Sequence, residues 1–301
     1  MVPPFIEFSN VTKDFGNGKG IFDLSFYVEK GEVFGFLGPN GAGKSTTIRH
    51  LMGFMKPQSG SCRIGGMDCF SQAARIQQSV GYLAGEIAFM EDMSGISYLN
   101  FAADMKGIRD RSSIRDLLDR FELNPKGKIK KMSKGMKQKI GLTAAFMGNP
   151  SVLILDEPTS GLDPLMQNRF VELLLERKKQ GCTVFMSSHI FEEVEKTCDR
   201  TAIIREGRLA DIVQMKELSK LRNRIYTVTL PDEESVQKLA SEAQLDIVKI
   251  CGRKVQIRVK KELPKTLKIL SDYQPTDLQT ETQSLEELFL HYYGEGGQKN
   301  A

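Results

Sequence analysis

Long apolar runs, tryptophan and a signal sequence are all missing from this chain of 301 residues. No stretch approaches the ~18 consecutive apolar residues that a helix needs to cross a bilayer, so the sequence predicts no direct membrane span. The first ten residues have neither the basic start nor the apolar segment of a signal peptide. If the protein works at a membrane, we therefore expect a different chain to span it.

An excess of either charge is also missing. The 42 lysines and arginines nearly balance the 38 aspartates and glutamates, which leaves a formal net charge of +4. Domains that bind nucleic acid in bulk are usually clearly basic, so we predict no nucleic-acid partner. The hydrophobic share of 40% is typical of a globular protein with a sizeable core. At ~150 residues per domain, the length indicates about two domains.

Cysteine is scarce, and the few cysteines show no pattern typical of a disulfide framework or a metal site. Their number is odd, and no pair has the C-x-x-C spacing. We therefore interpret them as reduced structural thiols of a cytosolic protein. The five residues are Cys62, Cys69, Cys182, Cys198 and Cys251.

The apolar pattern over residues 1–220 alternates between strand and helix signals, which predicts an α/β domain with a mainly parallel sheet. Alternation at 22–28 and an apolar run at 152–155 predict strands, the second buried on both faces. A helix is predicted over 44–54, after a glycine-rich turn. Further strands are predicted at 32–37, 183–186 and 202–205, and one face of another helix is marked by Ile114, Leu117, Leu118 and Phe121.

Residues 221–301 have a different pattern and are predicted to form a small accessory α+β domain. Strand and helix signals follow one another in the order β-α-β-β-α-β, which is typical of a ferredoxin-like domain. Ser284 and Glu287 have the spacing of a capping box and predict one more helix. The tail from Gly294 to Ala301 is predicted to be frayed.

One segment matches the phosphate-binding pattern G-x-x-x-x-G-K-[ST] between a predicted strand and a predicted helix. Its glycines let the backbone point successive N–H groups at phosphate oxygens, and the following helix adds the positive end of its dipole. Lys44 places a positive charge on the β- and γ-phosphates, and the Ser45 hydroxyl can bind Mg²⁺. The candidate phosphate loop consists of Gly38, Pro39, Asn40, Gly41, Ala42, Gly43, Lys44, Ser45 and Thr46.

Two acids end the apolar strand at 152–155. Ligands of parallel sheets bind at the carboxyl ends of the strands, so we expect both carboxylates beside the phosphates. Asp156 can hold Mg²⁺, directly or through water. Glu157 is the candidate to orient or deprotonate the attacking water.

Three further segments resemble motifs of ATP-binding-cassette (ABC) ATPases. D-E-P-T-S-G-L-D-P at 156–164 resembles the second nucleotide motif and the D-loop, and S-S-H at 187–189 resembles the switch-histidine segment. K-M-S-K-G-M-K-Q-K at 131–139 occupies the place of the family signature, usually L-S-G-G-Q. Order and spacing agree from Phe5 to about Lys220. The signature variant and the C-terminal extension together resemble the bacterial branch that exports drugs and antimicrobial peptides.

The resemblance implies roles for individual residues. Phe15 matches the aromatic residue that stacks on adenine. Two ATPase domains of this family close head to tail around ATP, so Ser133 and Gly135 would contact the γ-phosphate bound by the partner chain. Asp163 would couple the two sites, and His189 would contact the γ-phosphate.

The resemblance also implies an architecture and partners. The expected fold is α/β: a RecA-like P-loop NTPase core, an antiparallel β subdomain and a helical subdomain at about 86–150. The expected cofactors are ATP and Mg²⁺. A homodimer or heterodimer of ATPase subunits would drive an integral membrane permease, which would hold this cytoplasmic chain on the inner face of the cell membrane. Close to the expected docking surface are Met90, Met93, Ile96 and Tyr98.

Two features depart from the family pattern. The glutamine of the Q-loop is missing: Gly85 takes its place and Glu86 follows, either to contact water and Mg²⁺ or simply as a solvated acid. The signature has Lys134 and Met136 where glycine and glutamine are usual. Lys134 could add charge near the γ-phosphate, or belong with the other lysines of 126–139, which we interpret as a solvated face.

Other functions fit parts of the pattern. A soluble ABC-type ATPase switch that is not coupled to transport usually resembles fused tandem cassettes or carries long coiled coils, which 301 residues do not accommodate. Another P-loop enzyme, such as a kinase, would leave the signature and D-loop segments unexplained. The C-terminal domain could be a small-molecule sensor, which the sequence leaves open. The leading interpretation is the ATP-hydrolysing subunit of an exporter.

Overall fold

The phosphate-loop half of the chain and its C-terminal part form two separate units. The computed structural model describes residues 4–220, 224–242, 244–259 and 263–282. One unit is Met1–Met215 and the other is Lys216–Ala301. The predicted helix that begins at Ser284 and the predicted frayed tail lie outside the described residues.

An antiparallel sheet forms one layer of the first unit, with the strand order β2-β1-β4-β5. Its strands are β1 (Ile6–Asp14), β2 (Gly20–Val28), β4 (Ser59–Ile64) and β5 (Met67–Asp68). Burial alternates along the second half of β2, as the alternating apolar residues predict. The loop between β1 and β2 carries the candidate adenine-stacking residue, Phe15.

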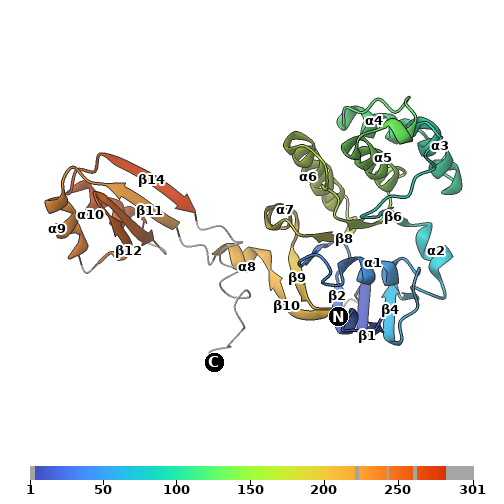
Figure 1. The fold of residues 1–301 in the computed structure, drawn as a ribbon, viewed down its shortest axis with the longest axis horizontal. Helices are drawn as coiled ribbons and strands as arrows, with labels where there is room; N and C mark the ends of the chain where they lie inside the picture. The colour runs from blue at the N-terminus through green and yellow to red at the C-terminus, as the bar shows by residue number, and fades with distance from the viewer. Residues whose placement is uncertain (1–3, 221–223, 243, 260–262, 283–301) are drawn as a thin grey trace. The chain divides into compact units, whose positions relative to one another are not determined.

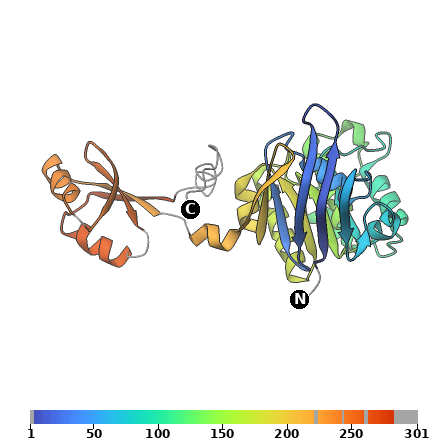
Figure 2. The same cartoon turned by 90° about the horizontal axis from the view of Figure 1, so that it is seen from below.

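A six-stranded sheet forms the second layer (Figures 1 and 2), and its strand order is β10-β9-β3-β8-β7-β6. Neighbouring strands run parallel, except that β10 is antiparallel to β9. Every residue of β3, β7 and β8 is buried, because helices and the first sheet cover both faces. The bounds are β3 (Val33–Leu37), β6 (Val80–Leu83), β7 (Val152–Asp156), β8 (Thr183–Ser188), β9 (Arg200–Arg205) and β10 (Arg208–Gln214).

A cluster of phenylalanine rings joins the two sheets. Phe8 and Phe26 of the antiparallel sheet stack with their centroids 4.6 Å apart, and Phe26 lies 5.6 Å from Phe34 of the parallel sheet. Phe36 and Phe185 extend the cluster, with centroids 5.3 Å apart. Aromatic pairs at these distances add to the free energy gained by burying their area. The cluster therefore fixes the antiparallel sheet against the strands that carry the site.

The helix after the phosphate loop, α1 (Lys44–Leu51), is three residues shorter than predicted. The chain turns at Gly53, whose φ of +69° lies outside the helical region and suits glycine. The other helices packed around the parallel sheet are α2 (Ala73–Gln77), α6 (Pro164–Lys179) and α7 (Phe191–Thr197), and α8 (Met215–Lys220) follows β10.

A group of helices lies apart from the antiparallel sheet, as Figure 1 shows. It contains α3 (Gly95–Met105), α4 (Ser112–Arg120), α5 (Lys134–Phe146) and a short 3-10 helix (Ile129–Lys131). The apolar face predicted for α4 is buried, which confirms the helical spacing. Within the described part of the chain, no helix combines the length and the apolar character that a membrane span needs.

The second unit is an antiparallel sheet in the order β12-β13-β11-β14. Its elements follow the predicted order β-α-β-β-α-β, and burial alternates along β13. Val228, Leu239, Val255 and Ile257 are fully buried in its own core. The bounds are β11 (Arg224–Thr229), α9 (Glu233–Ala240), β12 (Asp246–Cys251), β13 (Lys254–Val259), α10 (Leu263–Ser271) and β14 (Asp277–Thr282).

All five cysteines are free thiols, and four of them are buried. Burial raises the pKa of Cys198 to about 12 and that of Cys182 to about 11. Thiols that stay protonated are poor nucleophiles, which fits the structural role expected for these two. Cys251 differs because it is exposed at the end of β12.

Candidate functional site

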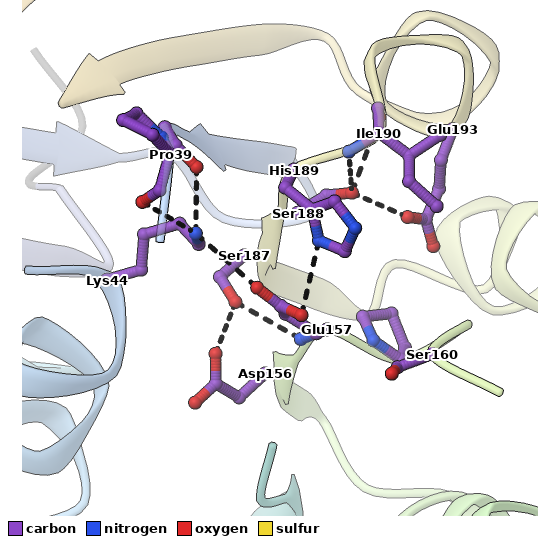
Figure 3. Close-up of polar contacts among 12 residues, drawn as sticks. Pro39, Lys44, Asp156, Glu157, Ser160, Ser187, Ser188, His189, Ile190 and Glu193 are labelled. Carbon is purple, nitrogen blue, oxygen red and sulfur yellow. Dashed lines mark hydrogen bonds and ion pairs between the residues drawn. The ribbon is translucent and has the colours of Figure 1, made fainter. Parts of the chain in front are cut away.

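The glycine-rich loop connects β3 to α1 and surrounds the Lys44 ammonium group. Gly43 has a φ of +108°, and a Cβ there would lie 2.8 Å from Ile21 Cγ2, so a larger residue would be strained and crowded. Lys44 is only 5% exposed. Its Nζ donates to the carbonyl oxygens of Gly38 at 2.7 Å and Pro39 at 3.2 Å (Figure 3). The loop thus holds a buried positive charge at the N-terminus of a helix, where phosphate binds well.

Asp156 is the last residue of β7 and Glu157 follows it, so both lie at the carboxyl end of the sheet, as predicted. Asp156 is 4% exposed, pairs in register with Ser187 on β8, and accepts a hydrogen bond from the Ser187 hydroxyl. The Glu157 N–H donates to Ser187 O at 3.2 Å and Ser187 Oγ at 3.1 Å. Glu157 has a φ of +48°, a left-handed conformation that costs a non-glycine residue on the order of 1–3 kcal/mol. This backbone conformation directs the Glu157 side chain away from that of Asp156.

The Glu157 carboxylate lies between two of the other predicted residues. Its Oε1 is 3.4 Å from Lys44 Nζ, and its Oε2 is 3.2 Å from His189 Nδ1. Figure 3 shows the three side chains converging from α1, β7 and the end of β8. A carboxylate held in this way can accept a proton from water, and both neighbours can contact phosphate oxygens.

A second buried acid stands behind the switch-histidine segment. The Ser188 hydroxyl donates to Glu193 Oε2 at 2.7 Å. Burial raises the pKa of Glu193 to about 7, although hydrogen bonds from Ser188 and Thr159 lower it in part, and the charge of Glu157 raises it further. Glu193 therefore changes charge close to neutral pH, four residues after His189 in the sequence.

The signature segment is tied to the loop after β7. Ser133 is exposed and caps α5 by accepting a hydrogen bond from a backbone N–H at 3.2 Å. Lys134 Nζ donates to Ser160 Oγ at 3.1 Å. Gln138 is 4% exposed, and its Nε2 donates to the carbonyl oxygen of Pro158 at 2.8 Å. The start of α5 is therefore fixed to the D-loop of the same chain.

These elements enclose a cavity of about 580 Å³. Its walls include Ser45, Asp156, Glu157, Glu86 and Lys134. No cationic side chain forms an ion pair with Asp156 among the residues that the structure describes, although its carboxylate is buried. A buried carboxylate without a counter-charge is costly, so Asp156 and the nearby Ser45 hydroxyl fit a hard divalent cation such as Mg²⁺.

Of the predicted site residues, Ser45, Asp156 and Glu157 line this cavity, and Phe15 and Asp163 are among those that do not. Phe15 is 52% exposed, and the Lys13 ammonium group lies 5.9 Å from its ring centroid. Asp163 caps α6 by accepting a hydrogen bond from the Met166 N–H at 3.0 Å. The roles given to Phe15 and Asp163 by the resemblance therefore stay predictions.

Comparisons with known proteins agree with this geometry. The family model described as ABC transporter matches residues 21–160. The ABC transporter ATP-binding protein YhcH of Bacillus subtilis is 35% identical over 299 residues, which cover 96% of both chains. This chain belongs to the family of ABC transporter ATP-binding proteins. It is accordingly an ATPase, the ATP-binding subunit of an ABC transporter.

Two further comparisons support the ABC ATPase assignment. The bacitracin transport ATP-binding protein BcrA of Bacillus licheniformis is 35% identical over 247 residues, or 80% of each chain. A solved ATP-binding subunit of an ABC transporter has a TM-score of 0.65 and 29% identity, and the match covers 72% of this chain and 92% of that one. The fold predicted from the sequence, a P-loop NTPase of the ABC type, is confirmed.

The Q-loop of this ABC ATPase passes directly beside the candidate magnesium ligand. A Cβ placed on Gly85 would lie 3.0 Å from Asp156 Oδ2. The glycine therefore allows an approach that a larger residue would resist. Glu86 lies in the wall of the same cavity, so a carboxylate is available next to the position at which the family usually has a glutamine.

Three residues of this ABC ATPase site were not singled out by the sequence. Ser187 binds Asp156, Gln138 binds the backbone after Glu157, and Glu193 binds Ser188. A signal for Ser187 exists, because it is the first polar residue at the carboxyl end of an apolar strand. Glu193 has no such signal, because its partner lies on another element. Gln138 belongs to the signature segment at 131–139, but its partners lie in the loop after β7.

Proposed function

We propose that this ABC ATPase dimerises around two MgATP molecules and that closure of the dimer drives a separate membrane permease, which exports an antimicrobial peptide or a drug-like molecule. The observation that carries the proposal is the convergence of Lys44, Glu157 and His189 beside the cavity. Ser133 is exposed at the start of α5, where a second chain can reach it. The permease would hold the chain at the cytoplasmic face of the membrane.

ATP binding changes the partners of Lys44. Its ammonium group leaves the carbonyl oxygens of Gly38 and Pro39 for the β- and γ-phosphate oxygens, which are stronger acceptors. Ser45 and Asp156 would hold Mg²⁺, which would neutralise charge that develops on the phosphates. The negative charge of the nucleotide thus meets a lysine that the apo loop has already positioned.

Hydrolysis then uses the residues at the end of β7 and β8. Glu157 accepts a proton from the attacking water through its carboxylate. His189, 3.2 Å from that carboxylate, donates a hydrogen bond to the γ-phosphate. Loss of the γ-phosphate removes the contacts that hold two chains together, so the dimer reopens.

A groove on the helical side supports docking of the permease. It has a volume of about 770 Å³, and its walls include Tyr98, Met105 and Lys106. Met105 is 74% exposed, which is unusual for so large an apolar side chain. Burial lowers the pKa of Lys106, whose Nζ donates to a backbone carbonyl at 2.9 Å. An apolar helix of the permease with one acidic side chain would fit this groove.

The groove and the nucleotide cavity have two lining residues in common. Phe54 and Tyr82 line both, and their rings meet edge to face with centroids 5.7 Å apart. A change in the cavity can therefore reach the groove through one pair of rings. This supports coupling of ATP hydrolysis to a docked partner. Export of an antimicrobial substance is supported by the bacitracin transport relative.

The decisive test of the dimer uses Glu157→Gln. This variant should bind ATP, accumulate as a closed dimer and turn over at least ~10²-fold more slowly, because it lacks the proton acceptor. Light scattering after size exclusion with MgATP measures the dimer, and phosphate release measures turnover. Glu172→Gln, an exposed acid on α6, is the control. Normal hydrolysis by the Glu157 variant would assign the proton acceptor elsewhere.

Docking is tested with Met105→Asp. Recovery of the chain with the membrane fraction, together with its permease, should fall at least tenfold, because a carboxylate in the apolar groove costs a few kcal/mol of burial. ATP hydrolysis by the purified chain should persist. Val248→Asp in the second unit, also an exposed apolar residue, is the matched control. Equal membrane recovery of both variants would exclude the groove as the docking site.

A further inference from the structure

We propose that Lys134 is a phosphate-binding residue that contacts phosphate only in the ATP-bound dimer. In the nucleotide-free chain its ammonium group rests on Ser160 Oγ, and in the ATP-bound dimer it moves to the terminal phosphate of the ATP held by the partner chain. The inference rests on the dimer proposed above. It gives the lysine of the signature a role that the usual glycine at this position has no side chain to perform.

The side chain of Lys134 is exposed beside the D-loop, where a second chain can reach it. Its Nζ donates to Ser160 Oγ at 3.1 Å, at the wall of this chain's own nucleotide cavity. Its methylene groups lie along the D-loop: a Cβ placed on Gly161 would be 3.2 Å from Lys134 Cγ and Cδ. Gly161 has a φ of +78°, so glycine suits both the backbone and the lysine that packs on it.

The resting partner of Lys134 is weak compared with those of nearby lysines. Lys130 forms an ion pair with Asp92 at 2.7 Å, and Lys137 with Glu91 at 3.4 Å. Lys134 forms no ion pair among the residues described in the structure, and its hydrogen bond goes to a neutral hydroxyl. A phosphate oxygen is a stronger acceptor for an ammonium group than a hydroxyl. Exchange of Ser160 for phosphate is therefore favourable.

The start of α5 does not depend on Lys134 for its position. Gln138 is buried and donates to the carbonyl oxygens of Pro158 at 2.8 Å and Glu157 at 3.3 Å. A Cβ on Gly135 would lie 2.8 Å from Gly161 O, which shows how closely the helix meets the D-loop. These contacts keep the helix in place when Lys134 changes partner. Variants of Lys134 and Ser160 should consequently fold.

The two partners of Lys134 lead to opposite predictions. Removal of the ammonium group weakens the ATP-bound dimer, because the phosphate loses a contact. Removal of the Ser160 hydroxyl destabilises only the resting state, so the dimer should form more readily. A purely structural contact between Lys134 and Ser160 would instead make both variants change in the same direction.

The experiment measures the ATP concentration that gives half-maximal dimerisation, in the Glu157→Gln background and with MgATP as the probe. Lys134→Met, which keeps the apolar stem, should raise this concentration at least tenfold. Ser160→Ala should lower it two- to fivefold. Lys137→Met is the matched control and should change it less than twofold. Binding of ADP to the single chain should stay within twofold in the Lys134 variant, because ADP lacks the terminal phosphate.

Each outcome has one meaning. If the Glu157→Gln parent stays monomeric at saturating MgATP, the proposed dimer is wrong. If the parent dimerises and Lys134→Met dimerises equally well, the dimer stands and the role of Lys134 is overturned. A rise for both Lys134→Met and Ser160→Ala, with unchanged thermal unfolding, would also overturn it. An unchanged value for Ser160→Ala would overturn the resting position on Ser160.

Discussion

The parallel sheet of the first unit and the antiparallel sheet of the second unit differ in how their residues are buried. In the first unit, β3, β7 and β8 are buried along their whole length, and apart from Thr183 at the start of β8 their polar residues lie at the carboxyl ends. In the second unit, β13 alternates between buried and less buried residues, as a sheet with one covered face does. A sheet with both faces covered concentrates its accessible polar groups at one edge. The chemistry is found at that edge.

The acids of the two units differ in the same way. Asp156 and Glu193 are buried, and Glu157 has a left-handed backbone. In the second unit, Asp232 caps α9 by accepting a hydrogen bond at 2.7 Å, and Glu234 pairs with an exposed lysine four residues later. These follow the ordinary rules for helices. Departures from local rules accumulate where a protein has a function to perform, which here is the first unit.

The largest expected effect is that of Lys44→Ala on ATP binding. A charge pair near 4 Å is worth roughly 4 kcal/mol at an effective dielectric constant of ~20, so affinity should fall about 10³-fold. Titration with a fluorescent ATP analogue measures it. Lys254→Ala in the second unit should leave affinity unchanged. A similar loss in both variants would mean that the second unit takes part in binding, and the contrast between the units would fail.

Ile257→Ala should destabilise the second unit alone. Ile257 is fully buried in β13, and such truncations cost about 2–5 kcal/mol through lost burial and a cavity. Urea unfolding measures the loss of stability, and hydrogen exchange measured separately in each unit shows which unit is affected. The control Ile250→Ala, at a largely exposed site on β12, should change stability by less than about 0.5 kcal/mol. Loss of ATP binding in the Ile257 variant would show that the units depend on one another.

Glu193 should make the stability of the first unit depend on pH. Its pKa is raised from 4.5 to about 7, so the folded chain prefers the protonated acid. The free energy of unfolding should therefore fall as pH rises from about 4.5 to 7, by at most roughly 3–4 kcal/mol. Glu193→Gln should remove this slope. Urea unfolding at pH 5 and pH 8 measures it, with Glu234→Gln as the exposed control; equal slopes in all three proteins would contradict it.

Phe15→Ala has the smallest expected effect. Stacking on a base is worth about 1–3 kcal/mol, so ATP affinity should fall roughly 5- to 150-fold. The loss should be the same for ATP and ADP, because both carry adenine. Nucleotide titration against Phe70→Ala, another exposed phenylalanine, measures it. A larger loss than that of Lys44→Ala would reverse the proposed order of phosphate and base recognition.

Much of the fold could be predicted because its signals are local. The apolar run that forms β7 and the alternation in β13 each reflect the burial of their own side chains. The strand β4 was not predicted individually, since Ser59–Ile64 is mostly small or polar. It forms because Phe8 faces Cys62 and Ile6 faces Ile64 across the ladder with β1. Such pairing depends on residues more than fifty positions away.

The site, like the fold, could be predicted only where its signals are local in the sequence. Motif spacing identified Lys44, Asp156 and Glu157, because the phosphate loop and the end of β7 are each continuous in sequence. The contact of Asp156 with Ser187 depends on the register of two strands, and that of Lys134 with Ser160 on how α5 meets a loop. The local sequence does not determine the register of the two strands or the packing of the helix on the loop.

The ring pair Phe54–Tyr82 has a mechanical consequence. Side chains move between discrete rotamers rather than by small degrees. A permease side chain that turned Tyr82 would widen or narrow the space beside Asp156 in a single step. If the permease docks in the groove as proposed, the ring pair would pass its contact to the nucleotide cavity as a change of rotamer.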